Sequence, residues 1–233
     1  FEAVRIAVKY MTPVILLTDA YLANGAEPWP IPDPAGLPDV PVTFRSDPSG
    51  FYPYLRDEKT LSRPWVIPGT KGLEHRIGGL EKDYLTGNVS YAPTNHEQMI
   101  RVRARKIAGI VREIPPLDVA GPAEGDLLVV GWGSTYGAIT QAVRELQATG
   151  HSVAHVHLRY LNPLPADLGG VLRRYRNVMV PEMNLGQLVR LLRAEYLVDA
   201  VGFNKIQGRP FKVSEIVNRC LRLLDGRPHE DTP

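Results

Sequence analysis

The second half of the chain alternates short apolar segments with amphipathic segments, and this alternation constrains the fold more than any other feature of the sequence. The apolar segments read DLLVVGW, SVAHVHL, NVMVPE and LVDAVGF, and stretches with helical spacing, roughly 10–15 residues long, lie between and after them. Continuous apolar strands joined by helices are typical of a parallel sheet that is covered on both faces. Residues 126–226 are therefore predicted to form a three-layer α/β domain with a parallel sheet.

The first 27 residues predict a helix and then one buried strand. Apolar residues recur at helical spacing from Phe1, and Val14–Leu17 is a continuous apolar run that begins after Pro13. A run of this kind is typical of a strand covered on both faces. Because the helical pattern is already in progress at Phe1 and no capping residue precedes it, we expect the chain to be a fragment that begins inside a domain.

The middle part, residues 28–125, is rich in proline and glycine. Ten of the 21 prolines lie between residues 28 and 68, which disfavours helices and central strands. The stretch RPWVIPGTKGLEHRIGGLEKDYLTG (63–87) has many glycines, yet Trp65, Leu73 and other apolar residues are scattered through it. Disordered segments lack such residues, and long irregular segments inside a domain usually bind or cover something. We therefore expect an ordered crossover that shapes a ligand site.

One helix is predicted within this middle part, over TNHEQMIRVRARKIAGIVREI (94–114). Thr94 and Glu97 match a capping box, and two prolines end the pattern. Its basic residues are expected to form a solvated face rather than an anion site. They are Arg101, Arg103, Arg105 and Lys106. The following DVAGPAEG is predicted to be a domain boundary.

Composition excludes several classes of protein. The 27 basic and 25 acidic residues give a net charge of +2 with no basic cluster, which argues against nucleic acid as a partner. The one cysteine, Cys220, excludes an internal disulfide and a cysteine-ligated cluster or zinc site, and its helical setting predicts core packing. No apolar run approaches the ~20 residues of a membrane span, and a lone thiol suits a reducing cytoplasm.

The turn GWGSTYGA (131–138) follows a predicted strand and opens a helix. Backbone amides at such a turn can hold an anion, so Gly131, Gly133 and Ser134 are candidate residues near an anion or cofactor. The glycines do not match the dinucleotide pattern G-x-G-x-x-G, because Gly137 falls one place late. The alternative is a tight turn that needs glycine only for packing.

Glu182 and Asn184 are further candidates, since they lie at the carboxyl end of a predicted parallel strand, where α/β sheets build their sites. The alternative for Asn184 is to cap the next helix. His151, His155 and His157 fall on one face of another strand, but no third metal ligand is apparent. A half-exposed strand face is favoured for them, and no metal site is predicted.

Within the crossover, Arg63 and Lys71 could meet a carboxylate, and the backbone around Thr70 could approach a ligand closely. Surface charge on a purely structural segment is the alternative.

Five motifs in order resemble the α subunit of the 2-oxoacid:ferredoxin oxidoreductases, and most closely the 2-oxoglutarate type. They are TPVILLTDAYLANGAEPW, PGTKGLEHRIGGLEKDYLTGNVSY, VVGWGSTYGAI, YLNPLP and VPEMNLGQL, and they span nearly the whole chain.

The resemblance implies a division of the chain into four parts. Residues 1–27 would be the truncated end of a pyrimidine-binding domain, and 28–125 a crossover with one helix. Residues 126–226 would be a domain similar to the transketolase carboxy-terminal domain, and 227–233 a tail.

The resemblance also implies a reaction in which 2-oxoglutarate, coenzyme A and two oxidised ferredoxins give succinyl-CoA, carbon dioxide and two reduced ferredoxins. The implied cofactors are thiamine diphosphate with Mg²⁺, shared with a β subunit, and a [4Fe-4S] cluster in that β subunit. The activating glutamate is expected upstream of Phe1, so this chain would hold no catalytic residue and be inactive alone. Its contribution would be substrate contacts from Arg63, Thr70 and Lys71.

Two alternative functions, and a third, structural one, stay open at this point. The same chemistry could act on pyruvate or on a branched-chain or aryl 2-oxoacid, since pocket residues come from several segments. A noncatalytic module that binds a nucleotide or coenzyme A at Gly131–Gly137 is the other. A purely structural scaffold is a third interpretation, which would describe the isolated fragment.

Overall fold

The computed structural model describes residues 1–226 and divides into two units. The first unit contains Phe1–Leu16 and Glu27–Glu113, and the second contains Leu17–Ala26 and the described residues from Ile114 onward. The tail predicted at 227–233 lies outside the described residues.

The second unit is built on a five-stranded sheet with the strand order β1-β3-β2-β4-β5. The strands are β1 (Val119–Ala120), β2 (Gly125–Trp132), β3 (Val153–Leu158), β4 (Tyr175–Glu182) and β5 (Ala200–Asn204). Strands β2 to β5 pair in parallel, which confirms the predicted α/β fold. The edge strand β1 runs antiparallel to β3, and its two residues are too few to show a pattern in the sequence.

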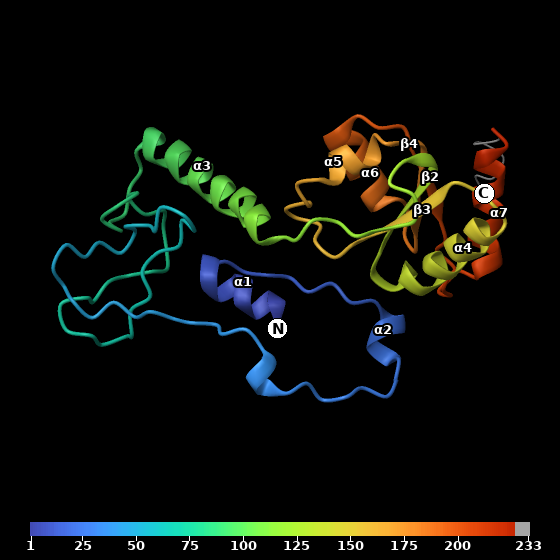
Figure 1. Cartoon of the computed structure of the whole chain (residues 1–233). Coiled ribbons are helices and arrows are strands. Elements are labelled where there is room, and N and C mark those ends of the chain that lie inside the picture. Colours follow the sequence, from blue (N-terminus) through green and yellow to red (C-terminus); the bar gives the residue numbers. More distant parts are fainter. Residues whose placement is uncertain (227–233) are drawn as a thin grey trace. The chain divides into compact units, whose positions relative to one another are not determined.

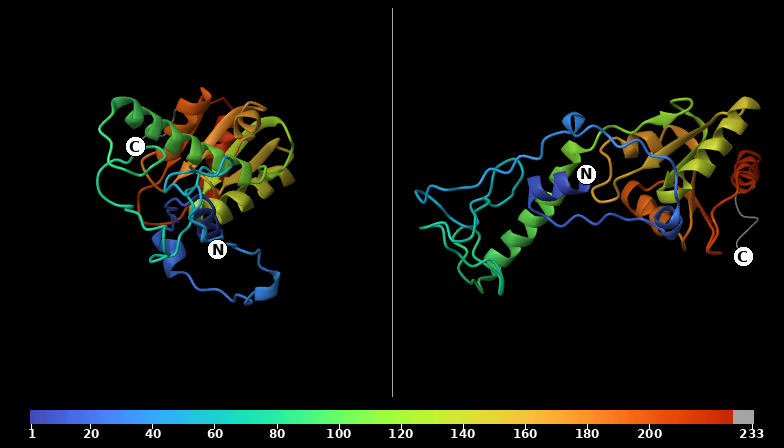
Figure 2. Two further views of the ribbon diagram at one scale, coloured as in Figure 1. Left: turned by 90° about the vertical axis from the view of Figure 1, so that its left-hand side faces the viewer. Right: turned by 90° about the horizontal axis from the view of Figure 1, so that it is seen from below.

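Helices cover both faces of this sheet (Figure 1 and Figure 2). One face packs against α4 (Tyr136–Ala148) and α7 (Val213–Leu224), and the other against α5 (Leu168–Leu172) and α6 (Gln187–Tyr196). Along β2, Leu127 and Val129 belong to the first cluster, whereas Leu128 and Val130 belong to the second. Both faces of β2 are therefore buried, which is why its sequence is an unbroken apolar run.

Cys220 is fully buried in the layer formed by α4 and α7. Burial raises the pKa of its thiol to about 12, so the side chain acts as a small apolar group. The predicted core role of Cys220 is confirmed.

The first unit contains little regular structure. Its helices are α1 (Glu2–Tyr10), the 3₁₀ turns η1 (Pro34–Gly36) and η2 (Ile110–Glu113), and α3 (Pro93–Gly109). The proline-rich part is irregular, as predicted, and has only the isolated bridges Phe44–Trp65 and Lys82–Val89. In the second unit, the short helix α2 (Ala20–Asn24) is capped by Asp19, whose side chain accepts a hydrogen bond of 3.0 Å from the amide of Leu22.

The glycine-rich loop is nevertheless anchored. Leu73 is 1% exposed, and the buried side chain of Asn95 on α3 donates to the carbonyl of Lys82 at 3.0 Å and accepts from the amide of Tyr84 at 2.8 Å. These contacts join the loop to the one long helix of its unit, which agrees with the expectation of an ordered crossover.

Two local predictions are wrong. Val14–Leu17 forms no strand, and Ile15 is 81% exposed, because no described strand pairs with this segment. The capping box at Thr94 and Glu97 does not form, because α3 begins one residue earlier at Pro93, whose fixed φ and missing amide suit the first helical position. Within residues 1–226 no helix has the length and apolar character needed to cross a membrane.

Candidate ligand sites

A cavity of about 960 Å³ lies within the first unit. Its walls come from the end of α1, from residues 41–43, 55, 57–60 and 62–65, and from Arg112 and Glu113. Arg63 is part of this lining, whereas Thr70 and Lys71 are not. The structure therefore brings one of the three predicted substrate contacts to a concave surface.

Three cations, Arg56, Arg63 and Lys106, interact with one another, and the two arginines also contact aromatic rings. The guanidinium carbon of Arg63 lies 5.0 Å from the ring centroid of Tyr54, and that of Arg56 lies 5.4 Å from the same ring. Burial, together with the positive charges of Arg56 and Arg63, lowers the pKa of Lys106 to about 8. Within the described residues none of the three forms an ion pair with a carboxylate. This grouping of positive charge is suited to binding a carboxylate from outside the chain.

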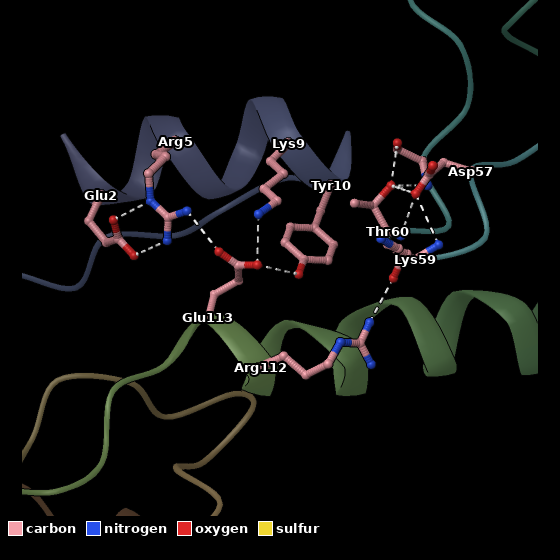
Figure 3. A network of polar contacts seen from close by, with 10 residues as sticks. Glu2, Arg5, Lys9, Tyr10, Asp57, Lys59, Thr60, Arg112 and Glu113 are labelled. Atoms are coloured by element: carbon pink, nitrogen blue, oxygen red, sulfur yellow. Dashed lines mark hydrogen bonds and ion pairs between the residues drawn. The ribbon is translucent and has the colours of Figure 1, made fainter. Parts of the chain in front are cut away.

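The walls of the cavity are joined by the polar network in Figure 3. The carboxylate of Glu113 accepts hydrogen bonds from Arg5 at 2.9 Å and from Lys9 at 2.7 Å, and a longer one from the hydroxyl of Tyr10 at 3.3 Å. Lys9 and Arg5 together lower the pKa of Glu113 to about 2. The network fixes α1 against η2 and thereby positions two sides of the cavity.

A second contact in Figure 3 holds the segment that leads to Arg63. Arg112 donates to the carbonyl of Lys59 at 2.6 Å. Asp57 closes the turn of this segment by accepting hydrogen bonds from the amides of Lys59 at 3.0 Å and Thr60 at 2.7 Å. Hydrogen bonds from Thr60 lower the pKa of Asp57, so the turn carries an ionised carboxylate at neutral pH.

Thr70 and Lys71 lie in a tight turn. The hydroxyl of Thr70 donates to the carbonyl of Ile67 at 2.8 Å, and Gly69 adopts a φ of +87°, which favours glycine. The side chain of Lys71 is exposed. A role in substrate contact for these two residues stays a prediction.

In the second unit, the structure brings Ser134 close to a residue far away in sequence. The hydroxyl of Ser134 donates a short hydrogen bond to the carboxylate of Asp19, and it lies 3.5 Å from the sulfur of Met183. Burial opposes ionisation of Asp19, but the hydrogen bonds from Ser134 and Leu22 outweigh it and lower the pKa. Asp19 is not among the predicted site residues, since only its place after an apolar run distinguishes it in the sequence.

The glycines beside Ser134 have a packing role. A Cβ at Gly131 would lie 2.6 Å from the Cδ1 atom of Ile139, so only glycine fits there without a shift. Gly133 has a φ of +59°, which favours glycine as the chain turns from β2 into α4. These contacts support the packing alternative for the turn, and the predicted anion or cofactor role of both glycines and Ser134 remains a prediction.

Glu182 and Asn184 cap α6. Glu182 is fully buried, and its carboxylate accepts hydrogen bonds from the amides of Leu188 at 2.8 Å and Val189 at 2.9 Å, and from Asn184 at 3.0 Å. Asn184 in turn accepts from the amide of Gly186 at 2.8 Å. The capping alternative for Asn184 is therefore realised, and Glu182 shares it, which the sequence did not indicate.

The described residues do not fit a thiamine diphosphate site with its Mg²⁺. Within residues 1–226 no group of three or more His, Cys, Asp or Glu side chains is arranged to hold a metal ion. Glu182, the only fully buried acidic side chain of this range, has both oxygens occupied by the amides of α6, so it is not positioned to activate a cofactor.

Two groups of basic or titratable residues differ from expectation. Lys106 is half-buried rather than part of a solvated face, although Arg101 and Arg103 on the same helix do pair with carboxylates at the surface. His155 is 3% exposed instead of lying on a half-exposed strand face, because β1 and α4 cover that part of β3. The order of polar and apolar residues within one element does not show which distant elements will bury its polar side chains.

Comparison with known proteins gives a consistent result. Residues 125–216 match the family model of the pyruvate:ferredoxin oxidoreductase core domain II. The 2-oxoglutarate oxidoreductase subunit KorA of Mycobacterium tuberculosis is 53% identical over 227 residues, which are 97% of this chain and 34% of that protein. Subunit alpha of 2-oxoacid:ferredoxin oxidoreductase 1 of Aeropyrum pernix is 30% identical over 96% of this chain and 36% of its own length.

The solved structure of 2-oxoglutarate:ferredoxin oxidoreductase from Magnetococcus marinus, with 2-oxoglutarate, coenzyme A and succinyl-CoA bound, matches with a TM-score of 0.87 and 33% identity. The match covers 94% of this chain and 39% of that one. The chain thus spans about a third of the length of the curated relatives it matches. Over the residues compared, the chain belongs with the α subunits of the 2-oxoacid:ferredoxin oxidoreductases.

Proposed function

We propose that this chain is part of the α subunit of a 2-oxoglutarate:ferredoxin oxidoreductase, which decarboxylates 2-oxoglutarate oxidatively to succinyl-CoA and reduces ferredoxin. The observation that carries the proposal is the 53% identity with a 2-oxoglutarate oxidoreductase subunit over nearly the whole chain. The bound 2-oxoglutarate and coenzyme A in the structural neighbour support the same substrates.

The cation group of Arg56, Arg63 and Lys106 supports a dicarboxylate rather than a monocarboxylate substrate. Pyruvate carries one carboxylate and 2-oxoglutarate carries two, so an additional cationic contact favours the longer acid. Arg63 combines this charge with a place in the lining of the cavity. We assign to Arg63 the contact with a substrate carboxylate, and to Lys106 and Arg56 the supporting positive charge.

The remaining machinery is proposed to come from other parts of the complex. Thiamine diphosphate with Mg²⁺, the [4Fe-4S] cluster of a β subunit, and the docking of ferredoxin are not assigned to any described residue of this chain. The role of this chain is to shape and charge the substrate pocket. A cytoplasmic location is proposed because the lone cysteine is free and buried.

The substrate assignment is tested with the purified complex, oxidised ferredoxin and coenzyme A. We expect kcat/KM for 2-oxoglutarate to exceed that for pyruvate and for branched-chain and aryl 2-oxoacids. Equal values for pyruvate and 2-oxoglutarate would contradict the substrate, and no ferredoxin reduction with any of them would contradict the activity.

The role of Arg63 is tested with Arg63→Ala in the same complex. Loss of one charge-assisted contact is expected to raise KM for 2-oxoglutarate about tenfold with a smaller effect on kcat. Arg105→Ala is the matched control, because Arg105 is an exposed arginine of α3 outside the cavity lining. Unchanged kinetics in Arg63→Ala would remove Arg63 from the substrate site.

A further inference from the structure

A second cavity, of about 590 Å³, lies within the second unit at the edge of the sheet. Its walls are one side of α4 from Tyr136 to Gln147, residues of β3, and the segments around residues 114–121 and 159–165. The volume is within the ~300–1,000 Å³ range of small-molecule sites. None of these residues takes part in the proposed substrate pocket of the first unit.

Two histidines of β3 form one wall of this cavity. His155 and His157 project from the same face of the strand, 5.8 Å apart between ring centroids, and the ring of Tyr136 lies 5.7 Å from the first and 5.0 Å from the second. Tyr136 is 54% exposed, so its ring extends this aromatic wall toward solvent.

Each of the two imidazoles has a buried nitrogen without a hydrogen-bond partner within the described residues: Nε2 of His155 and Nδ1 of His157. Nδ1 of His155 lies 3.3 Å from the hydroxyl of Thr140. Burial lowers the pKa of both histidines to about 4, so the rings are neutral at pH 7 and each carries one N–H. A buried N–H without an acceptor is unfavourable, and a ligand oxygen would relieve that cost.

The charged residues of the lining favour an anion. Arg144 on α4 and Arg159 after β3 both line the cavity, and within the described residues neither forms an ion pair. Asp118 is the one acidic side chain of the lining, so two permanent positive charges face one negative charge. A metal ion is disfavoured, because the described residues offer no third ligand beside the two histidines.

We propose that this cavity binds a small organic molecule that carries a phosphate or carboxylate group. Arg144 and Arg159 hold the anionic group, and the planar or apolar remainder lies against Tyr136 and the two histidine rings. The volume exceeds what a single inorganic anion fills, so the organic part contributes to the affinity.

The test is isothermal titration calorimetry of the full chain with four probes at fixed ionic strength: phenyl phosphate, benzoate, inorganic phosphate and phenol. We expect phenyl phosphate or benzoate to bind with one site, inorganic phosphate about tenfold more weakly, and phenol without measurable heat. Tighter binding of phenyl phosphate identifies a phosphate ligand, and tighter binding of benzoate a carboxylate. Absence of binding by both, or equal binding of phenol, would overturn the proposal.

Arg144→Gln and Arg159→Gln locate the binding. Both side chains are exposed, so the variants are expected to keep the fold, and each should weaken the better probe about tenfold. Arg190→Gln, which removes an exposed arginine of α6 outside the lining, should leave affinity unchanged.

His155→Phe keeps an aromatic ring but removes both nitrogens, and it should weaken binding several-fold. Because His155 is buried, its replacement can destabilise the fold, so the thermal unfolding of this variant is measured as well. If the variant is unfolded at the temperature of the titration, the two arginine variants alone test the site. Two outcomes would refute the anion site. One is full affinity for the better probe in the double variant Arg144→Gln/Arg159→Gln. The other is that no anion binds, while Zn²⁺ binds to the parent chain and not to His155→Phe.

Discussion

Glu113 shows how one surface carboxylate can organise a cavity. It accepts hydrogen bonds from Arg5, Lys9 and Tyr10, and its side chain is 22% exposed. The same positive charges that lower its pKa bring α1 and η2 together. The energetic value of such a partly exposed network is modest, because water screens the charges.

A pH dependence follows from Glu113. Its pKa is about 2 in the folded chain and 4.5 in the unfolded reference, so its stabilising contribution is complete above pH 4.5 and is lost as the pH falls to about 2. Glu113→Gln is expected to lower the free energy of unfolding by about 1 kcal/mol at pH 7 and much less at pH 2. Urea unfolding at both pH values measures this, with the exposed Glu58→Gln as control. An equal loss at both pH values would contradict the ionic origin.

The charge of Lys106 has the opposite effect on stability from the charge of Glu113. Its pKa is about 8 in the folded chain and 10.5 in the unfolded reference, so its charge destabilises the fold fully below pH 8, and this cost disappears as the pH rises toward 10.5. Lys106→Met is therefore expected to raise the free energy of unfolding at pH 7 by about 1 kcal/mol, after allowance for solvent screening. Thermal unfolding at pH 7 and pH 10 checks this, and a lower stability of Lys106→Met at pH 7 would contradict it.

If Lys106 supports substrate binding, the same variant should weaken it. In the complex, KM for 2-oxoglutarate is expected to rise in Lys106→Met while the chain itself becomes more stable, a trade-off that is common where sites concentrate like charge. Lys59→Met, which removes an exposed lysine outside the group of Arg56, Arg63 and Lys106, is the control.

At the scale of elements, a buried glutamate stabilises the connection between β4 and α6. By its place in the sequence, this residue, Glu182, is a candidate for a ligand site. Glu182 satisfies two of the amides that α6 leaves free at its start, and Asn184 satisfies another two, those of Gly186 and Gln187. Negative charge at a helix N-terminus also interacts favourably with the helix dipole. The connection is therefore rigid, and it keeps α6 packed on the sheet.

Glu182→Gln is expected to destabilise the second unit by about 2–3 kcal/mol, because the new NH₂ group faces a backbone amide and leaves one donor without an acceptor. Glu195→Gln, at an exposed position of the same helix, should change stability by less than about 0.5 kcal/mol. Urea unfolding followed by far-UV circular dichroism measures both. Equal stabilities of Glu182→Gln and the parent chain would show that the cap is dispensable.

At the scale of the whole molecule, the two units differ in how many of their backbone N–H and C=O groups form hydrogen bonds in regular secondary structure. The second unit has a sheet whose central strands are hydrogen-bonded on both sides, whereas residues 27–92 contain only short turns and isolated bridges. Large apolar side chains such as Trp29 and Ile31 are exposed in this irregular part.

Hydrogen exchange should follow this division. Amides of β2 and β4 are expected to exchange only by global opening of the second unit, while most amides of residues 27–92 exchange orders of magnitude faster. Mass-spectrometric hydrogen exchange of the 233-residue chain measures the two regions side by side. Comparable protection in both would contradict the difference.

Much of the fold followed from local patterns. The spacing of apolar residues specifies the strands β2, β3 and β4, the helices between them, and the core position of Cys220. Apolar residues at strand or helix spacing all fall on one face of their element, and that face is stable only when it packs against another layer. The run Val14–Leu17 has the same local pattern but remains exposed, since a strand also needs neighbours and none of the described strands pairs with it.

The sequence by itself determined the α/β layer order, the irregular middle part and, through its motifs, the family. Only the tertiary structure decided which polar residues are engaged: it joins Ser134 to Asp19, gives Glu182 to the start of α6, and turns Lys106 inward toward Arg56 and Arg63. The physical reason is that burial of apolar residues is governed by short-range periodicity, whereas the partner of a polar group depends on which distant segments the fold brings within hydrogen-bond distance.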